Sequence, residues 1–527
     1  MKRFVPLILL TAFFSCTPVQ EETVSYPDAE IVSFVFNGKA IAESRVPTDV
    51  SNGATWKLTF SKELTAGKLD PENLVMTGAS LSSFDVGVDG KVLTIASNTT
   101  LPAYTKISLH IYAGHNFGVN ILYDYKLSFI TAYDNSDKLP RISDDELFEK
   151  VQKQTFKYFW DYAHPTSGLA RERLGSGDDV TTGGSGFGLM TIPVAIERGW
   201  ITRSEGVQRV KTIVDFLCTS ERFHGAWPHW LNGTTGKVKP FSTKDDGADL
   251  VETAFLVEGL LTLRQYFNGS DAVEAEIRSK ITALWEGVEW TWFQRGGQNV
   301  LYWHWSPNYG WDMNMKIRSW NECLITYVLA ASSPTYSITK QVYDEGWKGT
   351  NSYNYKNPLF FVHYSYLGLD PRHLKDAYAD HWQQLSKHVR TNYEYCVNSK
   401  AGYGYSAQCW GLTASDYYDG YTASSPNHDT GTVAPTAALA SFPYSPDESM
   451  VAMKYFYYKL GDRLWGEYGF KDAFALKENW FAQSYIAIDQ GPIVVMMENY
   501  RTGLLWDYFM RDTDVQAGLT KLGFTWK

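Results

Sequence analysis

A change of pattern near residue 135 divides this chain of 527 residues into two parts. Before it, short apolar segments of strand length alternate with turn-forming pairs such as Asn37-Gly38 and Asp89-Gly90. After it, apolar residues recur at helical spacing, and strands do not alternate with helices. The chain is also too long for one ordinary hydrophobic core. The pattern therefore predicts a β-rich domain, a linker at residues 135–140, and a helical domain.

The first domain is expected to span residues 24–134 and to form an immunoglobulin-like β-sandwich. Short strands at this spacing are typical of that architecture. The expected strands lie at residues 31–36, 56–60, 91–95, 106–112 and 125–131. This part contains no cluster of catalytic type, so we expect it to act as a spacer or accessory module.

The second domain is expected to span residues 141–527 and to be all-α. Many helices of moderate length with long connections fit an α/α toroid of paired helices better than a compact bundle. The expected helices lie at residues 144–160, 186–198, 204–219, 248–267, 272–293, 319–331, 375–397, 448–460 and 492–511. In a toroid, the N-terminal ends of the inner helices and their loops form a concave face that can hold a ligand.

The first sixteen residues, 1–16, are typical of a secretion signal. Lys2 and Arg3 precede an apolar run at residues 4–14 that is too short to span a membrane. Ser15-Cys16 resembles a bacterial lipobox, and the following Gln20-Glu21-Glu22 resembles the export tag of surface lipoproteins. We expect a lipid on Cys16 to be the only membrane contact and to anchor the protein at the outer membrane or cell surface, with a periplasm-facing position as the alternative.

The composition limits the partners. The formal net charge of −10 argues against nucleic acid. Aromatic residues make up 15% of the chain, including 19 Trp and 34 Tyr. Such rings can stack on the apolar faces of sugars, although an aromatic-rich helical core needs no ligand.

Four cysteines remain after the signal segment. Cys218 and Cys323 lie in apolar helical surroundings and are expected in the core. Cys396 and Cys409 are expected to be free thiols, with a disulfide between them as the alternative. None has the spacing of a zinc site.

Three acids at helical spacing are the first candidate site. Asp245, Asp249 and Glu252 lie at i, i+4 and i+7. Thr243, with Asp246 three residues later, is a helix-capping pattern that predicts a helix start at this point. These acids either face solvent or line a pocket in which repulsion raises one pKa. Gly247 favours the pocket, because glycine lets another group approach the backbone.

Glu322 is the second candidate. It follows Trp320 at an expected helix start, after the aromatic loop at residues 302–311. A Glu at this position can simply serve the helix dipole. In an apolar, Trp-rich environment its pKa would rise, which is what a general acid needs.

Several loops combine aromatic and polar residues at positions suited to sugars. Residues 224–230 place two His and two Trp together, and residues 402–411 form a glycine–aromatic loop. Loop packing or a metal site is the alternative for the first. The residues expected to contact substrate are Trp227, His229, Trp230, Trp303, Trp311, Trp320, Tyr403, Trp410 and Gln490.

Other common chemistries fail their motif tests. There is no P-loop and no HExxH, and Gly183–Gly188 matches neither GxSxG nor a dinucleotide-binding turn after a strand. Carboxylates remain the best catalytic groups. They suit glycosidic bond cleavage, which needs one protonated acid and one carboxylate as base or nucleophile.

Four segments together resemble the glucoamylase-like domain that includes the β-1,2-glucanases of glycoside hydrolase family 144. They are residues 181–188, Asp245–Glu252, Trp320–Glu322 and residues 489–501. The resemblance covers residues 141–527. It implies an (α/α)6 barrel, no metal or other cofactor, and inverting cleavage of β-1,2-glucan (sophoro-oligosaccharide) chains.

The family's functional acids correspond to Asp245, Asp249, Glu252 and Glu322. The resemblance implies that Glu322 is the general acid, and we expect Asp245 to activate water. Asp249 and Glu252 would position sugar or relay the proton. The protein is expected to be a monomer and either endo-acting or a sophorose-releasing exo enzyme. The alternatives are a hydrolase of another linkage, such as α-1,4, and a glycan-binding lipoprotein without activity.

Overall fold

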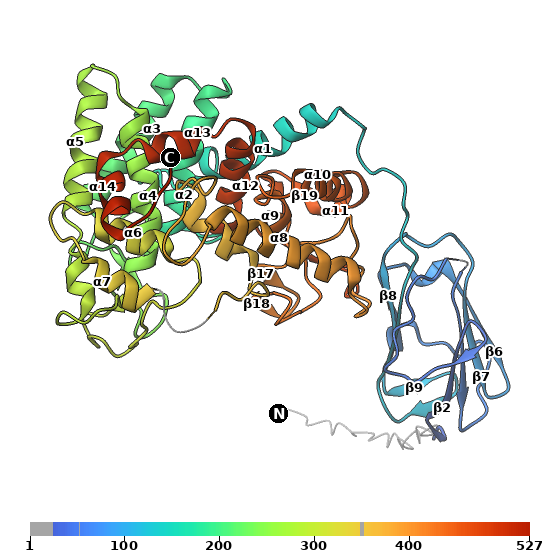
Figure 1. Cartoon of the computed structure of the whole chain (residues 1–527). Helices are drawn as coiled ribbons and strands as arrows, with labels where there is room; N and C mark the ends of the chain where they lie inside the picture. The colour runs from blue at the N-terminus through green and yellow to red at the C-terminus, as the bar shows by residue number, and fades with distance from the viewer. Residues whose placement is uncertain (1–24, 52, 348–351) are drawn as a thin grey trace, which may run out of the picture. The chain divides into compact units, whose positions relative to one another are not determined.

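The computed structural model describes residues 25–51, 53–347 and 352–527, so the expected signal segment and Cys16 lie outside the described residues. The chain divides into two compact units, with the boundary after Asp134 (Figure 1). The first unit is β-rich and the second is helical. Among the described residues, no helix combines the length and apolar character needed to cross a membrane.

The β-rich unit contains one five-stranded sheet, in the order β3-β2-β4-β7-β6, and two three-stranded sheets, β11-β8-β5 and β1-β10-β9. Its core includes Trp56, whose ring packs against Phe36 and Phe129 at centroid distances of 5.5 and 5.1 Å. The strands are β1 (Asp28–Ala29), β2 (Ile31–Phe36), β3 (Lys39–Ala40), β4 (Thr55–Phe60), β5 (Leu74–Thr77), β6 (Phe84–Asp89), β7 (Val92–Ser97), β8 (Lys106–Ile111), β9 (Gly114–Asn116), β10 (Val119–Ile121) and β11 (Tyr125–Ile130).

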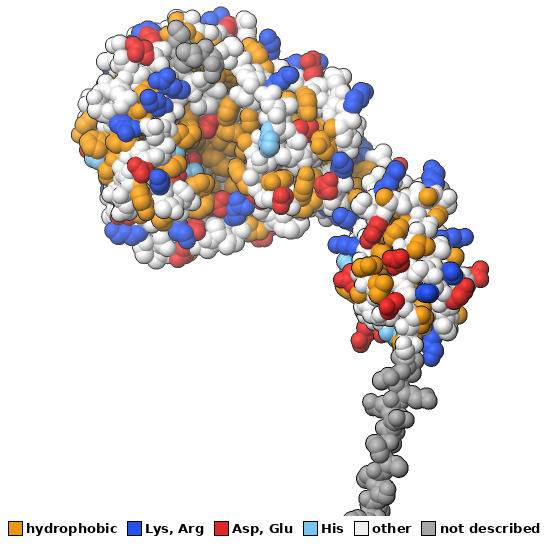
Figure 2. Space-filling model, turned by 90° about the horizontal axis from the view of Figure 1, so that it is seen from below, with side chains coloured by type: hydrophobic (Ala, Val, Ile, Leu, Met, Phe, Trp, Pro, Cys, Tyr) orange, Lys and Arg blue, Asp and Glu red, His pale blue; other side chains and the backbone are white. Residues whose placement is uncertain are grey.

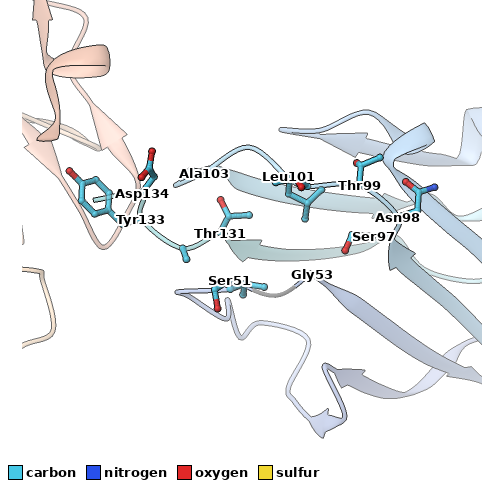
Figure 3. A pocket seen from close by; sticks show the side chains of 13 residues that line it. Ser51, Gly53, Ser97, Asn98, Thr99, Leu101, Ala103, Thr131, Tyr133 and Asp134 are labelled. Carbon is cyan, nitrogen blue, oxygen red and sulfur yellow. The ribbon is translucent and has the colours of Figure 1, made fainter. Parts of the chain in front are cut away.

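All five expected strands are present, as β2, β4, β7, β8 and β11. Sequence analysis missed the remaining strands, of which β5 and β6 are the longest. The first is only four residues long, and the second contains Gly87 and two aspartates, which are depleted in strands. A pocket of about 720 Å³ at the edge of this unit is lined mainly by hydroxyl and amide side chains, including Ser97, Asn98 and Thr99 (Figure 3). No group of carboxylates lines it.

The helical unit consists of helices joined by long connections that carry short strands. The helices are α1 (Asp144–Trp160), α2 (Thr182–Glu197), α3 (Arg203–Thr219), α4 (Leu250–Tyr266), α5 (Ala272–Glu286), α6 (Leu324–Ser332), α7 (Lys340–Val342), α8 (His381–Asn398), α9 (Pro435–Leu439), α10 (Pro446–Lys454), α11 (Gly461–Leu464), α12 (Ala487–Arg501), α13 (Leu504–Met510) and α14 (Thr513–Leu522). The strands are β12 (Asp179–Thr181), β13 (Trp230–Asn232), β14 (Val238–Lys239), β15 (Ala248–Asp249), β16 (His304–Trp305), β17 (Ala414–Tyr417), β18 (Gly420–Ala423), β19 (Trp465–Gly466), β20 (Gly469–Phe470), β21 (Phe474–Ala475) and β22 (Trp480–Phe481).

Two classes of helix follow from their burial. Helices α2, α4, α6 and α12 are buried on nearly every face, whereas α1, α3, α5 and α14 bury one stripe. Helix α2 packs against both α4 and α12, and members of the second class cover the buried helices: α1 packs on α12, α3 on α2, α5 on α4 and α14 on α6 (Figure 1). The apolar helices therefore form the centre of the unit.

Glycines allow α2 and α4 to cross closely. A Cβ on Gly186 would lie 2.1 Å from the carbonyl oxygen of Phe255, and one on Gly259 would lie 2.2 Å from that of Gly186. No larger residue fits either position. The glycine-rich segment at residues 183–188 therefore serves helix packing as well as the site described below.

Some expectations about helix ends and pairs are wrong. Helix α12 begins at Ala487, so Pro492 lies inside the helix rather than at its first position. Glu498 and Arg501 lie three positions apart, a spacing that predicts an ion pair between them, but Glu498 pairs with Arg198 and Arg501 pairs with Glu149. Spacing along one helix could not reveal these partners, which come from α2 and α1.

The cysteines in the described residues are all free. Cys323 is buried, as expected, and Cys396 and Cys409, which are also buried, are free thiols, as expected. Cys218 is exposed, contrary to expectation, because it lies on the outer face of the amphipathic helix α3.

Candidate active site

Asp249 is the fixed point of the site because it caps α4. Its Oδ1 accepts hydrogen bonds from the N–H groups of Val251 and Glu252, at 3.0 and 2.9 Å. Its backbone belongs to β15, which pairs with β16 so that Asp249 lies opposite His304. The expected helix start near Thr243 is wrong. Residues 241–247 form turns, held there because Gly247 packs against the backbone of Trp305 with no room for a side chain.

Two histidines face the buried carboxylate of Asp249. The Nδ1 atom of His229 lies 3.1 Å from Oδ2, and Nε2 of His304 lies 3.6 Å from the same oxygen. Burial opposes a charge on His229, but Glu252 and Asp249 outweigh it and raise the pKa of His229 to about 9. Burial lowers the pKa of His304, which stays neutral. Burial also disfavours ionised Asp249, yet the hydrogen bond from His229 keeps the pKa of Asp249 below its usual value.

Asp245 lies in the turn before β15, not on the helix, yet it reaches the same place. Its Oδ2 is 3.5 Å from Nε2 of His304, and its Oδ1 has no hydrogen-bond partner although the residue is buried. Burial and the neighbouring Asp249 raise the pKa of Asp245 to about 7. An unpartnered carboxylate oxygen of this kind is available to a ligand or to water.

The same groups could also hold a cation. Donor atoms of His229, Asp245 and Asp249 lie within 4.8 Å of one another. These side chains already have partners without a metal: His229 contacts Asp249, and Asp245 contacts His304. A protonated His229 would also have to lose its proton to become a ligand. The expectation that the site needs no metal stays a prediction.

Glu252 connects α4 to the start of α2. Its Oε2 accepts a hydrogen bond of 2.7 Å from the N–H of Gly183, and its Oε1 lies 4.0 Å from Nε2 of His229. A Cβ on Gly183 would lie 2.5 Å from Oε2, so the glycine makes this contact possible. Burial raises the pKa of Glu252.

Glu322 lies in the turn before α6, two residues ahead of the helix that was expected to contain it. Its carbonyl oxygen accepts a hydrogen bond from the hydroxyl of Ser365. Burial raises the pKa of Glu322 to about 7, and the charges of Glu252 and Asp249 add to the shift. These interactions place Glu322 in the same site as the acids of residues 245–252.

A second group of carboxylates was missed by sequence analysis. Asp489, in the first turn of α12, accepts a hydrogen bond of 3.4 Å from the hydroxyl of Tyr364. Its side chain also shares a hydrogen bond with the side chain of Asp472. Burial and Asp472 raise the pKa of Asp489 well above its usual value, while burial and Asp416 raise that of Asp472 to about 7. The pair therefore retains a proton at pH values where an ordinary aspartate has lost it.

Tyr364 joins the two groups of acids. Its buried hydroxyl interacts electrostatically with Asp489 on one side and with Glu322 and Glu252 on the other. No spacing in the sequence relates Asp416, Asp472 and Asp489 to each other, and sequence analysis selected none of the three as a catalytic candidate. The tertiary fold alone brings them to the site.

Most aromatic candidates are partly exposed and available to a ligand, namely His229, Trp230, Trp303, Trp311, Trp320 and Tyr403. His229 stacks on Phe241 at 4.3 Å, and Phe241 also packs against Trp230 at 4.9 Å. Sequence analysis did not select Phe241, although half of its side chain is exposed beside the acids. Its place in the turn before Asp245 was the available signal.

Three expected substrate contacts are wrong because the residues are buried. The indole N–H of Trp227 donates to Ser220 Oγ and that of Trp410 donates to the carbonyl of Glu448. The amide of Gln490 donates to the carbonyl of Phe470. Each of the three is at most 1% exposed, so these side chains support the fold.

Figure 2 shows a hollow in the helical unit in which hydrophobic side chains gather, with acidic and histidine side chains among them.

The chain resembles known proteins over this unit. A family described as "Putative glucoamylase" matches residues 314–513. A crystal structure of an endo-β-1,2-glucanase from Chitinophaga pinensis, in complex with sophorotriose and glucose, is 51% identical, with a TM-score of 0.71 and coverage of 73% of this chain and 99% of the other. This chain belongs to glycoside hydrolase family 144, the β-1,2-glucanase family.

Two further family members come from Parabacteroides distasonis. An exo β-1,2-glucooligosaccharide sophorohydrolase acting at the non-reducing end is 46% identical over 419 residues, which are 72% of this chain. The chain spans 58% of the length of that relative. The structure of a β-1,2-glucanase is 37% identical, covers 95% of this chain and 74% of the other, and has a TM-score of 0.71.

Proposed function

We propose that this protein is a glycoside hydrolase that cleaves β-1,2-glucan by an inverting acid/base mechanism. The observation that carries the proposal is the pairing of Glu322, which is protonated up to about pH 7, with carboxylates in the same buried site. Glycosidic cleavage needs a protonated acid for the leaving oxygen and a second carboxylate to act on water. A binding protein has no need of clustered, mutually repelling acids.

In this mechanism Glu322 donates its proton to the glycosidic oxygen as the bond to the anomeric carbon breaks. Asp245 takes a proton from the water that attacks that carbon from the opposite face. Its unpartnered Oδ1 supports this role. The Asp249–His229 ion pair holds the helix start and one side of the site, and Glu252 connects it to Gly183.

The linkage comes from the relatives. The sophorohydrolase and the endo-glucanase act on β-1,2-linked glucans from a chain end and within chains, and both modes stay open for this protein. The word glucoamylase in the family description is the ground for the alternative, α-1,4 linkage in starch. Fold likeness does not fix linkage.

The layering supports a finer view of the fold. We infer that α2, α4, α6 and α12 belong to the inner ring of an (α/α)6 toroid and that α1, α3, α5 and α14 belong to its outer ring. Their different burial and their pairwise packing support this arrangement. The facing antiparallel sheets support an immunoglobulin-like sandwich for residues 25–134.

The location of the protein is also a proposal. The lipobox-like Ser15-Cys16 supports a secreted lipoprotein attached by a lipid on Cys16 to the outer membrane or cell surface, or facing the periplasm. We expect a monomer. Metabolic labelling with a fatty acid, compared between the natural protein and Cys16→Ala, tests the anchor.

The role of Glu322 is tested by Glu322→Gln. We expect turnover of β-1,2-glucan to fall by 10²-fold to 10⁴-fold, the usual contribution of a general acid, while binding of sophoro-oligosaccharides persists. Glu286→Gln, at the exposed end of α5, is the matched control and should keep full activity. Full activity of Glu322→Gln would rule out the assignment, and binding without turnover by the unaltered protein would favour a glycan-binding lipoprotein.

A further inference from the structure

A second pocket in the helical unit lies next to the acids. Its volume is about 620 Å³, within the range of 300–1,000 Å³ typical of ligand pockets. Its lining includes Arg173, Asp416, Tyr417, Tyr421, Trp480 and Ser484. Asp416 belongs both to this lining and to the carboxylate group with Asp472 and Asp489, so the pocket opens directly beside that group.

Aromatic side chains form the walls. Tyr417 and Tyr421 come from the hairpin β17–β18, and Trp480 begins β22. Tyr421 is 49% exposed, and Tyr417 and Trp480 are partly exposed. Exposed aromatic faces with polar edges suit a ring that is apolar on its faces and carries hydroxyls at its rim. A pyranose sugar has both properties.

The polar base of the pocket carries no excess positive charge. Arg173 donates to both carboxylate oxygens of Asp416, at 3.0 and 3.2 Å, and to Glu172 at 2.9 Å. The hydroxyl of Ser484 donates to Asp416. Because two carboxylates already neutralise the guanidinium, a phosphate or other anion gains no free positive charge here. A neutral ligand rich in hydroxyl groups can instead donate to the carboxylates and accept from the guanidinium.

Tyr421 links the pocket to the candidate acid. Its side chain lines the pocket, and burial together with Asp489 and Asp472 raises the pKa of Tyr421 well above its usual value. Tyr364 interacts electrostatically with Tyr421 and also with Glu322. The backbone N–H of Asp416 donates to Asp472 at 2.7 Å, and the hydroxyl of Tyr364 donates to Asp489 at 3.4 Å, so hydrogen bonds connect the pocket lining with the carboxylates beside Tyr364.

We infer that this pocket binds a glucosyl unit of the substrate chain, adjacent to the units held at the carboxylates. Tyr421 is a binding residue of this pocket. The inference rests on the proposed function. The occupant is a neutral β-1,2-linked glucosyl unit, because the pocket adjoins the acids and offers aromatic faces and a neutralised polar base.

The test compares two tyrosines of one hairpin. Tyr421→Ala removes a wall of the pocket, whereas Tyr418→Ala changes a side chain of similar exposure, 47%, that does not line it. Both substitutions are made in full-length Glu322→Gln, and affinity for sophoro-oligosaccharides of two to six glucose units is measured by calorimetry. Thermal unfolding checks that each variant is folded, and Trp480→Ala takes the place of Tyr421→Ala if the latter is not.

We expect Tyr421→Ala to lose about tenfold or more in affinity for the longer chains and to lose the gain in affinity that the parent shows when the chain grows into the pocket. Tyr418→Ala should match the parent. Equal affinities of Tyr421→Ala and the parent for every chain length would overturn the inference while leaving the proposed function intact. If the parent binds no sophoro-oligosaccharide and the unaltered protein hydrolyses none, the inference and the proposed function are both overturned.

Discussion

At the scale of single residues, one physical effect gives neighbouring carboxylates opposite properties. Burial raises the pKa of Glu322 to about 7, and burial together with Asp249 raises that of Asp245 to about 7 against the opposing effect of His229. Burial acts on Asp249 as well, but the hydrogen bond from His229 and two backbone N–H groups keep that carboxylate ionised. The site thus holds neutral and charged acids together near neutral pH.

The raised pKa values predict how activity depends on pH. Glu322 must be protonated to donate, so kcat/KM should fall as pH rises above about 7. Asp245 must be ionised to accept a proton, so kcat/KM should also fall below about 7. We expect a narrow bell centred near pH 7 in steady-state assays on β-1,2-glucan. A constant kcat/KM between pH 7 and 9 would exclude Glu322 as the acid.

The Asp472–Asp489 pair makes a prediction about stability. The folded protein holds a proton on this pair at pH values where an unfolded aspartate has lost it, so stability is lost as pH rises from about 4 to 7. Asp472→Asn removes this titration, and its amide can donate to Asp489. Relative to the unaltered protein, the variant should gain about 3 kcal/mol between pH 4 and pH 7, since the pKa of Asp472 is raised from 3.8 to about 7 and one pKa unit is about 1.4 kcal/mol. The free energy of unfolding of both proteins is measured at several pH values. A difference between the variant and the unaltered protein that does not change with pH would contradict the prediction.

Residue types and spacing were enough to select Asp245, Asp249, Glu252 and Glu322, because clustered acids beside glycine and tryptophan are an unusual pattern. They were not enough to separate exposed from buried aromatics. Trp227 lies in the same short loop as His229 and Trp230, yet only its indole turns into the core. Partners from distant segments decide such orientations.

At the scale of elements, periodicity located most helices but not where they begin. The acids at i, i+4 and i+7 suggested one continuous helix. In the structure the helix begins only after Asp249, strand β15 precedes it, and Asp245 lies in a turn. The pairing of β15 with β16 comes from residues 304–305, more than fifty positions away. Strands β5 and β6 were missed for lack of a strong local pattern, whereas helix α14 was missed although it has an amphipathic pattern between the capping residues Asp512 and Gly523.

The crossing of α2 and α4 is open to a direct test. Gly186→Ala places a Cβ against the Phe255 carbonyl, which cannot move without disturbing α4. We expect a loss of about 3 kcal/mol or more in unfolding free energy, together with reduced activity, because α2 also positions Gly183 at Glu252. Gly287→Ala, at the C-terminal end of α5 with its nearest neighbour 3.2 Å away, serves as control and should cost far less. Equal stability of the two variants would contradict this account of the crossing.

At the scale of the whole molecule, two units with separate cores should unfold separately. Trp56→Ala opens a cavity in the core of the β-rich unit, and we expect it to lower only the transition of that unit, by about 3–5 kcal/mol. Hydrolysis should be unchanged, because every acid of the candidate site lies in the helical unit. Calorimetry and activity assays on the full chain test this, and loss of activity in a folded variant would show that the β-rich unit takes part in catalysis.

The most direct test of the central claim is product analysis. The protein from residue 21 onward is incubated with linear β-1,2-glucan, starch and laminarin in parallel, and the products are separated by chromatography. The account predicts products from β-1,2-glucan alone: sophorose for exo action, or a ladder of sophoro-oligosaccharides for endo action. Products from starch alone would contradict the β-1,2 linkage, and products from none of the three would contradict the hydrolase itself.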